Sequence, residues 1–413
     1  MISTAEKPER LILVAAYSGS EEAAGHSLDE LEGLVETAGG LVCGRLIQSR
    51  DYAHPVTYLG SGKLYELNEL IYMLQADGIV TDDELSPVQI RSLEDICKVK
   101  IMDRTLVILD IFAKHAVTHE GKIQVELAQL KYMAARLTGL RSSLSRLGGG
   151  IGTRGPGEKK IEMDRRLIHG RIGALKDELR QIQKHRDVTR QNRTDSMLPL
   201  AAIVGYTNAG KSTLFNRITG ANVLEQDQLF ATLDATIRQT DLPQGRSMLL
   251  SDTVGFINKL PHHLIEAFRS TLEETRYADI IIHVVDVSDP QMDLHMYVVY
   301  DTLRELEITG KPVITVFNKV DLCPDAAMLR DTRADKVFTV SARTGRGVES
   351  LLSGILEVLK EQSQYVEKLF RYSELHKVQL IRQYGSLQSE EYTEDGVIVT
   401  GYIPRRIAGL LYE

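Results

Sequence analysis

Apolar runs alternate with amphipathic helical patterns over the first part of the chain, up to about residue 118. Apolar runs bounded by turn-forming residues are typical of strands, and alternation with helices favours a parallel sheet. The pattern therefore predicts an α/β domain over residues 1–118. We expect Ser86 to cap the third helix. The predicted strands are Leu11–Tyr17, Leu41–Ile47, Gly78–Thr81 and Val99–Met102, and the predicted helices are Leu28–Thr37, Lys63–Gln75 and Pro87–Cys97.

Residues 119–195 change to a heptad-like pattern. Apolar residues recur in steps of three and four in two stretches, which predicts two helices packed as an antiparallel hairpin. Between them lies the string GGGIGTRGPGEKKIEMDRR, with six Gly and one Pro from Gly148 to Gly157, a composition that opposes helix. It is either a flexible connector or a loop that a partner orders. The apolar positions are Ile123, Leu127, Leu130, Ala134 and Leu137, then Ile168, Ile172, Leu175, Leu179 and Ile182.

Strands and helices alternate again over residues 196–362, which end in a predicted helix, Val348–Leu359. Residues 363–413 predict a small α+β domain. Its elements are a short strand from Tyr365, a helix over Ser373–Gln383 and a strand pair, Ser386–Glu391 with Gly396–Pro404.

The composition excludes some classes of protein but does not indicate a function. The chain has 413 residues, 43% hydrophobic and 26% charged, as is usual for soluble globular proteins. It contains no apolar run of the roughly 18 residues that cross a bilayer, and its first residues, MISTAEKPER, do not resemble a secretory signal. Three scattered cysteines, Cys43, Cys97 and Cys323, suit reduced thiols. We expect a cytoplasmic monomer, with peripheral attachment to a membrane as an alternative.

Charge is distributed unevenly along the chain. Residues 131–195 carry 16 Lys and Arg against 7 Asp and Glu, although the whole chain has a net charge of −8. A basic segment in an acidic protein favours a polyanionic partner, here the phosphate backbone of RNA and not DNA. An ordinary solvated face is the alternative. The basic residues around the Gly-rich string are Arg141, Arg146, Arg154, Lys159, Lys160, Arg165 and Arg166.

The string GYTNAGKS, Gly205–Ser212, follows an apolar run and precedes a helical pattern. This is the strand–loop–helix context of a phosphate-binding loop, whose backbone N–H groups surround the β-phosphate. Lys211 is expected to contact the β- and γ-phosphates, and Ser212 to bind Mg²⁺. The nucleotide-contacting residues of this segment are Gly205, Tyr206, Thr207, Asn208, Ala209, Gly210, Lys211, Ser212 and Thr213.

A second string, NKVD, predicts the choice of base. The Asp321 carboxylate can accept hydrogen bonds from the imino and amino groups of guanine, and Asn318 can brace the loop. Adenine would leave that carboxylate unpaired, and polar sites reject such analogues by about 10⁴–10⁵. Lys319 is expected over the base plane, with Ser341 and the Ala342 N–H at the guanine carbonyl. The chain is therefore predicted to bind GTP and GDP.

The strings DTVGF and TLDAT supply the nucleotide switch. Asp252 is expected to hold Mg²⁺ through a water, and the Gly255 N–H to contact the γ-phosphate. Thr232 is our choice for the second Mg²⁺ hydroxyl, and Thr236 is the competitor. Interactions that depend on the γ-phosphate should disappear after hydrolysis.

Two residues refine the expected catalysis. Phe256 follows DTVG, where many GTPases carry a Gln that orients the attacking water, so hydrolysis should be slow without a supplied group. Asn208 could ligate a monovalent cation such as K⁺ between the phosphates, or it could simply form a turn. The predicted catalytic residues are Lys211, Thr232, Gly255 and Asn208.

These four strings, combined with the Gly-rich string upstream, resemble the HflX family of translational GTPases over residues 10–361. The resemblance implies a Ras-like P-loop GTPase domain with a mostly parallel sheet. It also implies a protein that binds the large ribosomal subunit, places the hairpin loop near the peptidyl-transferase region, and splits or rescues stalled or idle ribosomes under stress. In that family Phe256 and Asn208 are expected.

Two other functions have less support in the sequence. An RNA-binding adaptor, whose nucleotide domain controls affinity with little turnover, fits the same strings. A GTPase domain serving a transporter or a base-modifying enzyme lacks a membrane segment or a Cys and His cluster. The string Gly60–Lys63 lacks the spacer of a phosphate loop, so we expect a helix start there, with a second nucleotide site as the minority alternative.

Overall fold

The computed structural model describes residues 7–147, 156–195, 198–221, 229–230, 236–259, 275–323, 329–404 and 408–409. Arg154 and Thr232 lie outside these residues, and so do the side chains of Arg141, Arg146, Lys159 and Lys160. The chain forms two compact units. The first is Met1–Gln183 with Gln226–Asp234 and Asn258–Ser270, and the second contains the rest of the chain.

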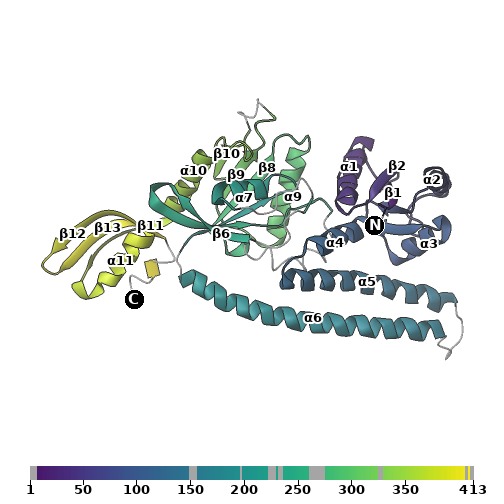
Figure 1. Cartoon of the computed structure of the whole chain (residues 1–413), viewed down its shortest axis with the longest axis horizontal. Helices are drawn as coiled ribbons and strands as arrows, with labels where there is room; N and C mark the ends of the chain where they lie inside the picture. Colours follow the sequence, from purple (N-terminus) through teal and green to yellow (C-terminus); the bar gives the residue numbers. More distant parts are fainter. Residues whose placement is uncertain are drawn as a thin grey trace, which may run out of the picture. The chain divides into compact units, whose positions relative to one another are not determined.

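The first unit begins with a four-stranded parallel sheet in the order β2-β1-β3-β4. Its central strand β1 is buried on both faces, as a sheet covered on both sides requires. Helices α2 and α3 cover one face, and α1 and α4 lie on the other (Figure 1). The strands are β1 (Arg10–Tyr17), β2 (Leu41–Ser49), β3 (Gly78–Thr81) and β4 (Lys100–Asp103), and the helices are α1 (Glu21–Thr37), α2 (Ser61–Leu74), α3 (Pro87–Cys97) and α4 (Arg104–His115).

The predicted parallel sheet and its elements are confirmed, with two differences in the helices. Helix α1 begins at Glu21, earlier than predicted, because the Ser20 side chain caps it by accepting a hydrogen bond from the Ala23 N–H. Helix α4 was missed, because it is apolar on most of its surface and gives no helical period. Ser86 forms the expected cap of α3, and α2 begins at Ser61 as the helix-start interpretation predicted.

The helical hairpin is also confirmed. Its helices are α5 (His119–Leu147) and α6 (Pro156–Asp195). Helix α6 starts at Pro156, inside the string expected to be non-helical, because proline suits the first turn of a helix. The predicted apolar positions, apart from Leu137, form the seam. Its buried members are Ile123, Leu127, Ala134, Ile172 and Leu175, with Leu130, Ile168, Leu179 and Ile182 packed against them.

Two short segments from the middle of the chain also belong to the first unit. The Phe230 ring meets Phe112 of α4 edge-on, with ring centroids 4.7 Å apart. The Lys259 Nζ forms ion pairs with Asp82 and Asp83, at 2.5 and 2.7 Å. The segment just before the TLDAT string and the segment just after the DTVGF string are thus held by the N-terminal α/β fold.

The second unit is built on a six-stranded sheet in the order β10-β9-β8-β5-β7-β6, parallel except for the β6–β7 pair. Its core joins apolar residues of these strands to helices α7 and α10. The strands are β5 (Leu200–Gly205), β6 (Thr236–Leu242), β7 (Arg246–Asp252), β8 (Ile280–Asp286), β9 (Val313–Asn318) and β10 (Lys336–Thr339), and the helices are α7 (Lys211–Thr219), α9 (Met292–Glu305) and α10 (Val348–Glu361).

The C-terminal α+β fold lies in the same unit. Three antiparallel strands in the order β11-β13-β12 carry helix α11 on one face, over a core that includes Phe370 and Ile381 (Figure 1). The predicted strand pair and helix are confirmed. The elements are β11 (Ser363–Phe370), α11 (Leu375–Tyr384), β12 (Ser386–Thr393) and β13 (Gly396–Pro404), with a short 3₁₀ turn at Tyr372–Glu374.

Candidate nucleotide-binding site

The GYTNAGKS string forms the turn between β5 and α7. Two of its glycines are required by close approach: a Cβ on Gly205 would lie 2.3 Å from the Val284 carbonyl oxygen, and one on Gly210 would lie 2.3 Å from the Asn318 side-chain nitrogen. Asn208 adopts a left-handed conformation, with φ of 60°, and its side chain is exposed. The two glycines and the left-handed Asn208 thus form the tight turn before α7 that a phosphate-binding loop needs.

Lys211 is the first residue of α7 and is buried, with 7% of its surface exposed. Its Nζ donates a hydrogen bond to the Tyr206 carbonyl at 2.7 Å, which holds the ammonium inside the loop. Burial lowers the pKa of Lys211 to about 8, although the Asp252 carboxylate opposes the shift. A buried ammonium in this position is suited to the phosphates of a nucleotide, which would replace the water it has lost.

Ser212 and Asp252, the two expected metal ligands of the described residues, are brought together. The Ser212 hydroxyl donates to Asp252 Oδ2 at 2.8 Å. Hard oxygen ligands at the start of a phosphate loop suit Mg²⁺, which binds few protein groups and completes its shell with waters and phosphate oxygens. Thr236, the alternative hydroxyl, opens β6 and pairs with Asp252 across the antiparallel ladder. Ser212 and Asp252 therefore suit a Mg²⁺ ion.

The DTVGF string pairs directly with the phosphate loop. The Thr207 N–H donates to the Phe256 carbonyl at 2.7 Å, and the Phe256 N–H donates to the Gly205 carbonyl at 3.0 Å. A Cβ on Gly255 would lie 2.8 Å from Lys211 Nζ and 3.0 Å from Thr207 Cα, so a larger residue would crowd the phosphate loop. The Phe256 ring is 2% exposed and belongs to the core, and it offers no group that could orient a water. The Thr207 hydroxyl is buried beside these residues and has no hydrogen-bond partner among the described residues.

Asn318 braces the site as predicted. Its side-chain nitrogen donates to the Ala209 carbonyl at 2.9 Å, and its oxygen accepts from the Ala342 N–H at 2.9 Å. The NKVD loop and the phosphate loop are therefore tied by one side chain. The Ala342 N–H was expected at the guanine carbonyl, and in this structure its partner is Asn318.

The remaining base-recognition residues lie on either side of this brace. The Lys319 Nζ pairs with Asp286 at 2.6 Å, which fixes the lysine at the end of β8. A hydrogen bond from the Ser341 side chain lowers the pKa of Asp321, so this carboxylate stays ionised and able to accept two hydrogen bonds. That geometry matches the donor pair on the guanine edge.

One contact of the site was not predicted from the sequence. The Tyr206 ring stacks on His295 of α9, with centroids 3.7 Å apart and an angle of 11° between the planes. His295 Nδ1 lies 3.4 Å from Asp289. This contact could not be predicted from the sequence, because Tyr206 and His295 lie far apart in the chain and meet only in the folded domain.

Three further features of the described residues concern membrane spans, metal clusters and cysteines. No helix among the described residues is both long and apolar enough to cross a bilayer. In the same part of the chain, no group of three or more His, Cys, Asp and Glu side chains is arranged to hold a metal. Cys43, Cys97 and Cys323 are free thiols, and burial raises the pKa of Cys97 to about 11.

Three family descriptions match consecutive parts of the chain. "GTP-binding GTPase N-terminal" matches residues 25–113, "GTP-binding GTPase Middle Region" matches residues 115–193, and "50S ribosome-binding GTPase" matches residues 200–319. A solved GDP complex of a GTP-binding protein from Sulfolobus solfataricus aligns with 85% of this chain and 98% of its own, at 25% identity and a TM-score of 0.42.

Curated relatives match almost from end to end. The chain is 60% identical to GTPase HflX of Lacrimispora saccharolytica over 407 residues, which is 98% of this chain and 96% of the relative. It is 47% identical to the protein of that name from Caldanaerobacter subterraneus over 97% and 92% of the two chains, and 42% identical to that from Escherichia coli over 87% and 85%. Together with the guanine-nucleotide site, these matches establish that the chain belongs to the HflX family and is a GTPase that converts GTP to GDP and phosphate.

Proposed function

We propose that this GTPase binds the large ribosomal subunit in its GTP form, through the basic hairpin 131–195, and that the subunit accelerates hydrolysis. The match of residues 200–319 to a family described as 50S ribosome-binding is the observation that carries the proposal. The net charge of +9 over residues 131–195 suits an RNA surface. Phe256, which stands where many GTPases carry the Gln that orients the water, is buried and has no polar group for this role, which suits a GTPase that depends on its partner.

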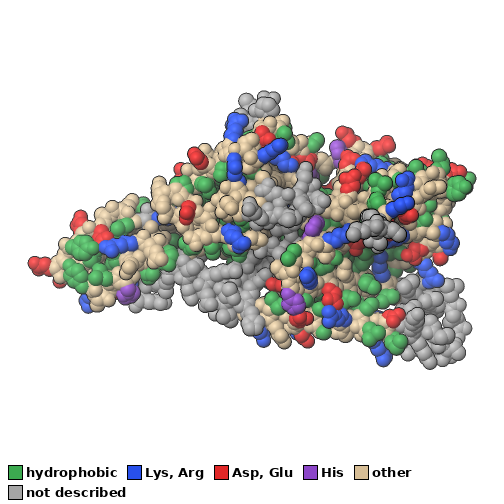
Figure 2. Space-filling view, viewed as in Figure 1, with side chains coloured by type: hydrophobic (Ala, Val, Ile, Leu, Met, Phe, Trp, Pro, Cys, Tyr) green, Lys and Arg blue, Asp and Glu red, His purple; other side chains and the backbone are tan. Residues whose placement is uncertain are grey.

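Basic side chains on the described part of α6 support this proposal. Lys176, Arg180 and Lys184 are exposed and follow one another in steps of four, so they share one face of the helix. Arg180 also pairs with Asp177. Both blue and red side chains are visible on the hairpin in Figure 2, so the charge is mixed there rather than uniform. Three basic residues on one face of a helix, among acidic neighbours, favour contacts to a few RNA phosphates.

Cosedimentation with separated ribosomal subunits tests the proposal. We expect the protein to sediment with large subunits in a non-hydrolysable GTP analogue and to be released in GDP. Replacing Lys176, Arg180 and Lys184 by Ala should weaken binding and reduce the slope of log affinity against log salt by about 0.7–0.9 for each phosphate that is no longer neutralised. A control with Lys98, Arg304 and Arg330 changed to Ala removes three charges elsewhere. Equal binding in both nucleotides, or equal weakening by both triple variants, would contradict the proposal.

Single-turnover hydrolysis separates the enzyme from the adaptor function. We expect large subunits to raise the rate by about 10²-fold or more, since a supplied catalytic group can contribute 10³–10⁵. An unchanged rate with bound subunits would favour the RNA-binding adaptor, whose nucleotide only controls affinity.

We propose that the Asn208 side chain ligates K⁺ between the phosphates. Its exposed side chain on a left-handed turn residue supports this role. Hydrolysis should then be faster in K⁺ than in Na⁺ for the wild type, and equal in the two salts for Asn208→Ala. Equal wild-type rates would remove the cation from the mechanism.

The family resemblance supports a further step, in which the bound protein, acting as a cytoplasmic monomer, splits stalled or idle ribosomes. Light scattering of intact ribosomes should fall on addition of protein with GTP, and a Lys211→Ala variant should have no effect. Binding without a fall in scattering would mean that the protein only occupies the ribosome.

A further inference from the structure

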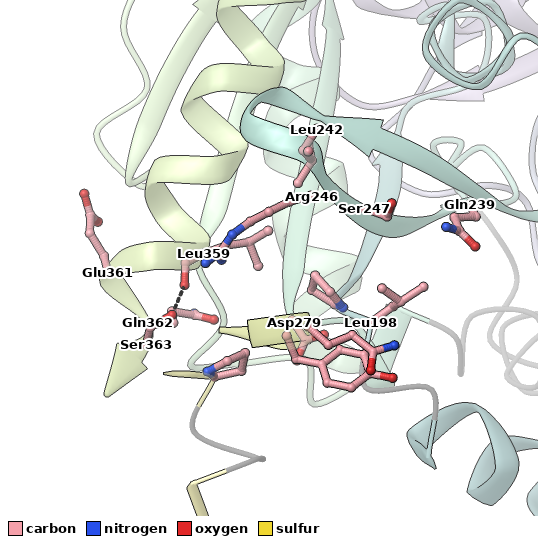
Figure 3. Close-up of a pocket in the computed structure, with 15 residues that line it drawn as sticks. Leu198, Gln239, Leu242, Arg246, Ser247, Asp279, Leu359, Glu361, Gln362 and Ser363 are labelled. Carbon is pink, nitrogen blue, oxygen red and sulfur yellow. Dashed lines mark hydrogen bonds between the residues drawn. The ribbon is translucent and has the colours of Figure 1, made fainter. Parts of the chain in front are cut away.

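A cavity of about 760 Å³ lies in the second unit, at the end of the sheet remote from the phosphate loop. Its walls come from the starts of β5, β7 and β8, from the end of α10 and from the C-terminal α+β fold (Figure 3). Cavities of roughly 300–1,000 Å³ are typical of small-ligand sites. The nucleotide cannot account for it, because Arg246 and Asp252 are the first and last residues of β7 and lie at its opposite ends.

Arg246 is the distinctive residue of this cavity. Its side chain extends from β7 toward Leu359 at the end of α10 (Figure 3). The Nη2 atom is buried and has no hydrogen-bond partner among the described residues. Burial lowers the pKa of Arg246, and no carboxylate in that part of the chain offsets the shift. Arg45 and Arg382, by contrast, each have a carboxylate that raises the pKa.

Lys211, which is expected to face the nucleotide phosphates, likewise has a pKa lowered by burial, although Arg246 as a whole is only half-buried. The two acids that line the cavity have other partners. Asp279 accepts a hydrogen bond from the Leu200 N–H at 2.7 Å, and Glu361 pairs with Lys336 at 3.4 Å. The guanidinium thus has donors in a fixed fork, and its buried Nη2 has no acceptor among the residues that the structure describes.

The rest of the lining is both polar and apolar. Leu198, Leu242, Leu359 and Tyr384 offer an apolar surface, and Gln239, Gln362 and Gln383 offer amides. An inorganic ion would contact the guanidinium and leave most of a cavity of about 760 Å³ unfilled. A molecule that fits must combine an anionic oxygen group with an apolar or aromatic body.

We propose that this cavity is a second ligand site, which binds a small organic anion through the Arg246 guanidinium and holds its apolar body against Leu242, Leu359 and Tyr384. The anionic group is a carboxylate or a phosphate ester, since both match the planar fork of arginine. The site is separate from the guanine-nucleotide site.

Calorimetric titration of the full chain, saturated with Mg²⁺ and GDP, tests this site. The probes are phenyl phosphate, benzoate, benzyl alcohol and inorganic phosphate. We expect phenyl phosphate or benzoate to bind with a Kd below about 1 mM, and the preferred probe identifies the anionic group. Benzyl alcohol lacks the charge and inorganic phosphate lacks the apolar body, so each should bind at least about tenfold more weakly.

Variants assign the binding to the cavity. Arg246→Gln should weaken binding of the preferred probe at least about tenfold, and Arg238→Gln, an exposed arginine on the neighbouring strand, should leave it unchanged. Gln383→Trp fills the cavity from the exposed end of α11 and should abolish binding while Arg246 is retained. GDP affinity reports that each variant is folded. Failure of both anions to bind, or equal binding to Arg246→Gln, would overturn the proposal.

Discussion

The Ser212 hydroxyl donates a hydrogen bond to Asp252 Oδ2 at 2.8 Å, which joins the start of α7 to the end of β7. The two oxygen ligands expected for Mg²⁺ are thus adjacent before any side chain has to move. The contribution of Mg²⁺ to nucleotide affinity can therefore be measured apart from that of the phosphate loop, by changing Ser212.

Ser212→Ala should therefore weaken GTP binding about tenfold in Mg²⁺, or about 1.4 kcal/mol, because it removes a hydroxyl that would bind the ion. In EDTA the variant and the wild type should bind alike. Ser251→Ala is the matched control, since its hydroxyl is buried one residue before Asp252 and has no hydrogen-bond partner among the described residues. Equal weakening with and without Mg²⁺ would show that Ser212 supports the fold rather than the ion.

The low pKa of Lys211 predicts how nucleotide affinity depends on pH. Burial lowers this pKa to about 8, and bound phosphates must raise it, because they favour the ammonium. GDP affinity should accordingly be constant below about pH 8 with respect to this group and should fall as pH rises above that value. Titrations on both sides of this pKa, from about one unit below it to one unit above it, measure the effect.

Lys211→Arg is the control for that series. Arginine remains charged at every pH tested, so its affinity, whatever its absolute value, should lack this part of the pH dependence. The guanine ring titrates equally for both proteins. If the variant and the wild type show the same decline, Lys211 is not its cause.

Asp321 predicts a change of base preference. Its carboxylate is held ionised by the hydrogen bond from Ser341. Asp321→Asn replaces one acceptor by a donor, which suits a base that carries a carbonyl where guanine carries its amino group. Affinity for GDP should fall about 10²-fold or more, and affinity for xanthosine diphosphate should rise. Competition binding with the two nucleotides checks this, and an unchanged preference would exclude Asp321 from base recognition.

The buried ion cluster of the first unit predicts a local decrease in stability. Arg104 is 1% exposed and pairs with Asp82 at 2.6 Å and Glu30 at 2.5 Å, and Lys259 pairs with Asp82 as well. Arg104→Met leaves buried carboxylates without their main cation, which should cost about 3–5 kcal/mol. Hydrogen exchange in β1 and β3 should report the change, whereas exchange in β8 and β9 should not.

The same cluster gives a pH test. Burial opposes ionisation of Asp82, but Arg104 and Lys259 outweigh it and lower the pKa of Asp82. A lowered pKa contributes stability that is present above the unfolded value of about 3.9 and is lost as pH falls through the folded value. The difference between wild type and Arg104→Met should therefore shrink in acid. Lys259→Met, in which Arg104 still neutralises Asp82, should show a smaller effect at neutral pH.

Most elements could be predicted from the sequence because their signals are local. The apolar runs of β1 and β3 and the capping signal of Ser86 act through neighbouring residues, and so does the seam of α5 and α6. Helix α4 could not be predicted in this way, because burial on most sides removes the polar positions that reveal a helical period. The start of α1 was missed for a related reason, since the stretch between Ser20 and Leu28, EEAAGHS, carries little periodicity.

The sequence by itself determined the guanine-nucleotide chemistry, since the residues that surround phosphates and base stand in short strings whose local turns bring them into position. Only the tertiary structure decided which distant residues meet these strings. Tyr206 stacks on His295, and Lys259, just after the DTVGF string, pairs with Asp82 and Asp83. Away from these strings, the half-buried Arg246 lies in a cavity whose lining also comes from segments far apart in the chain. Such contacts depend on how sheets and helices pack, and no local pattern of residues encodes that packing.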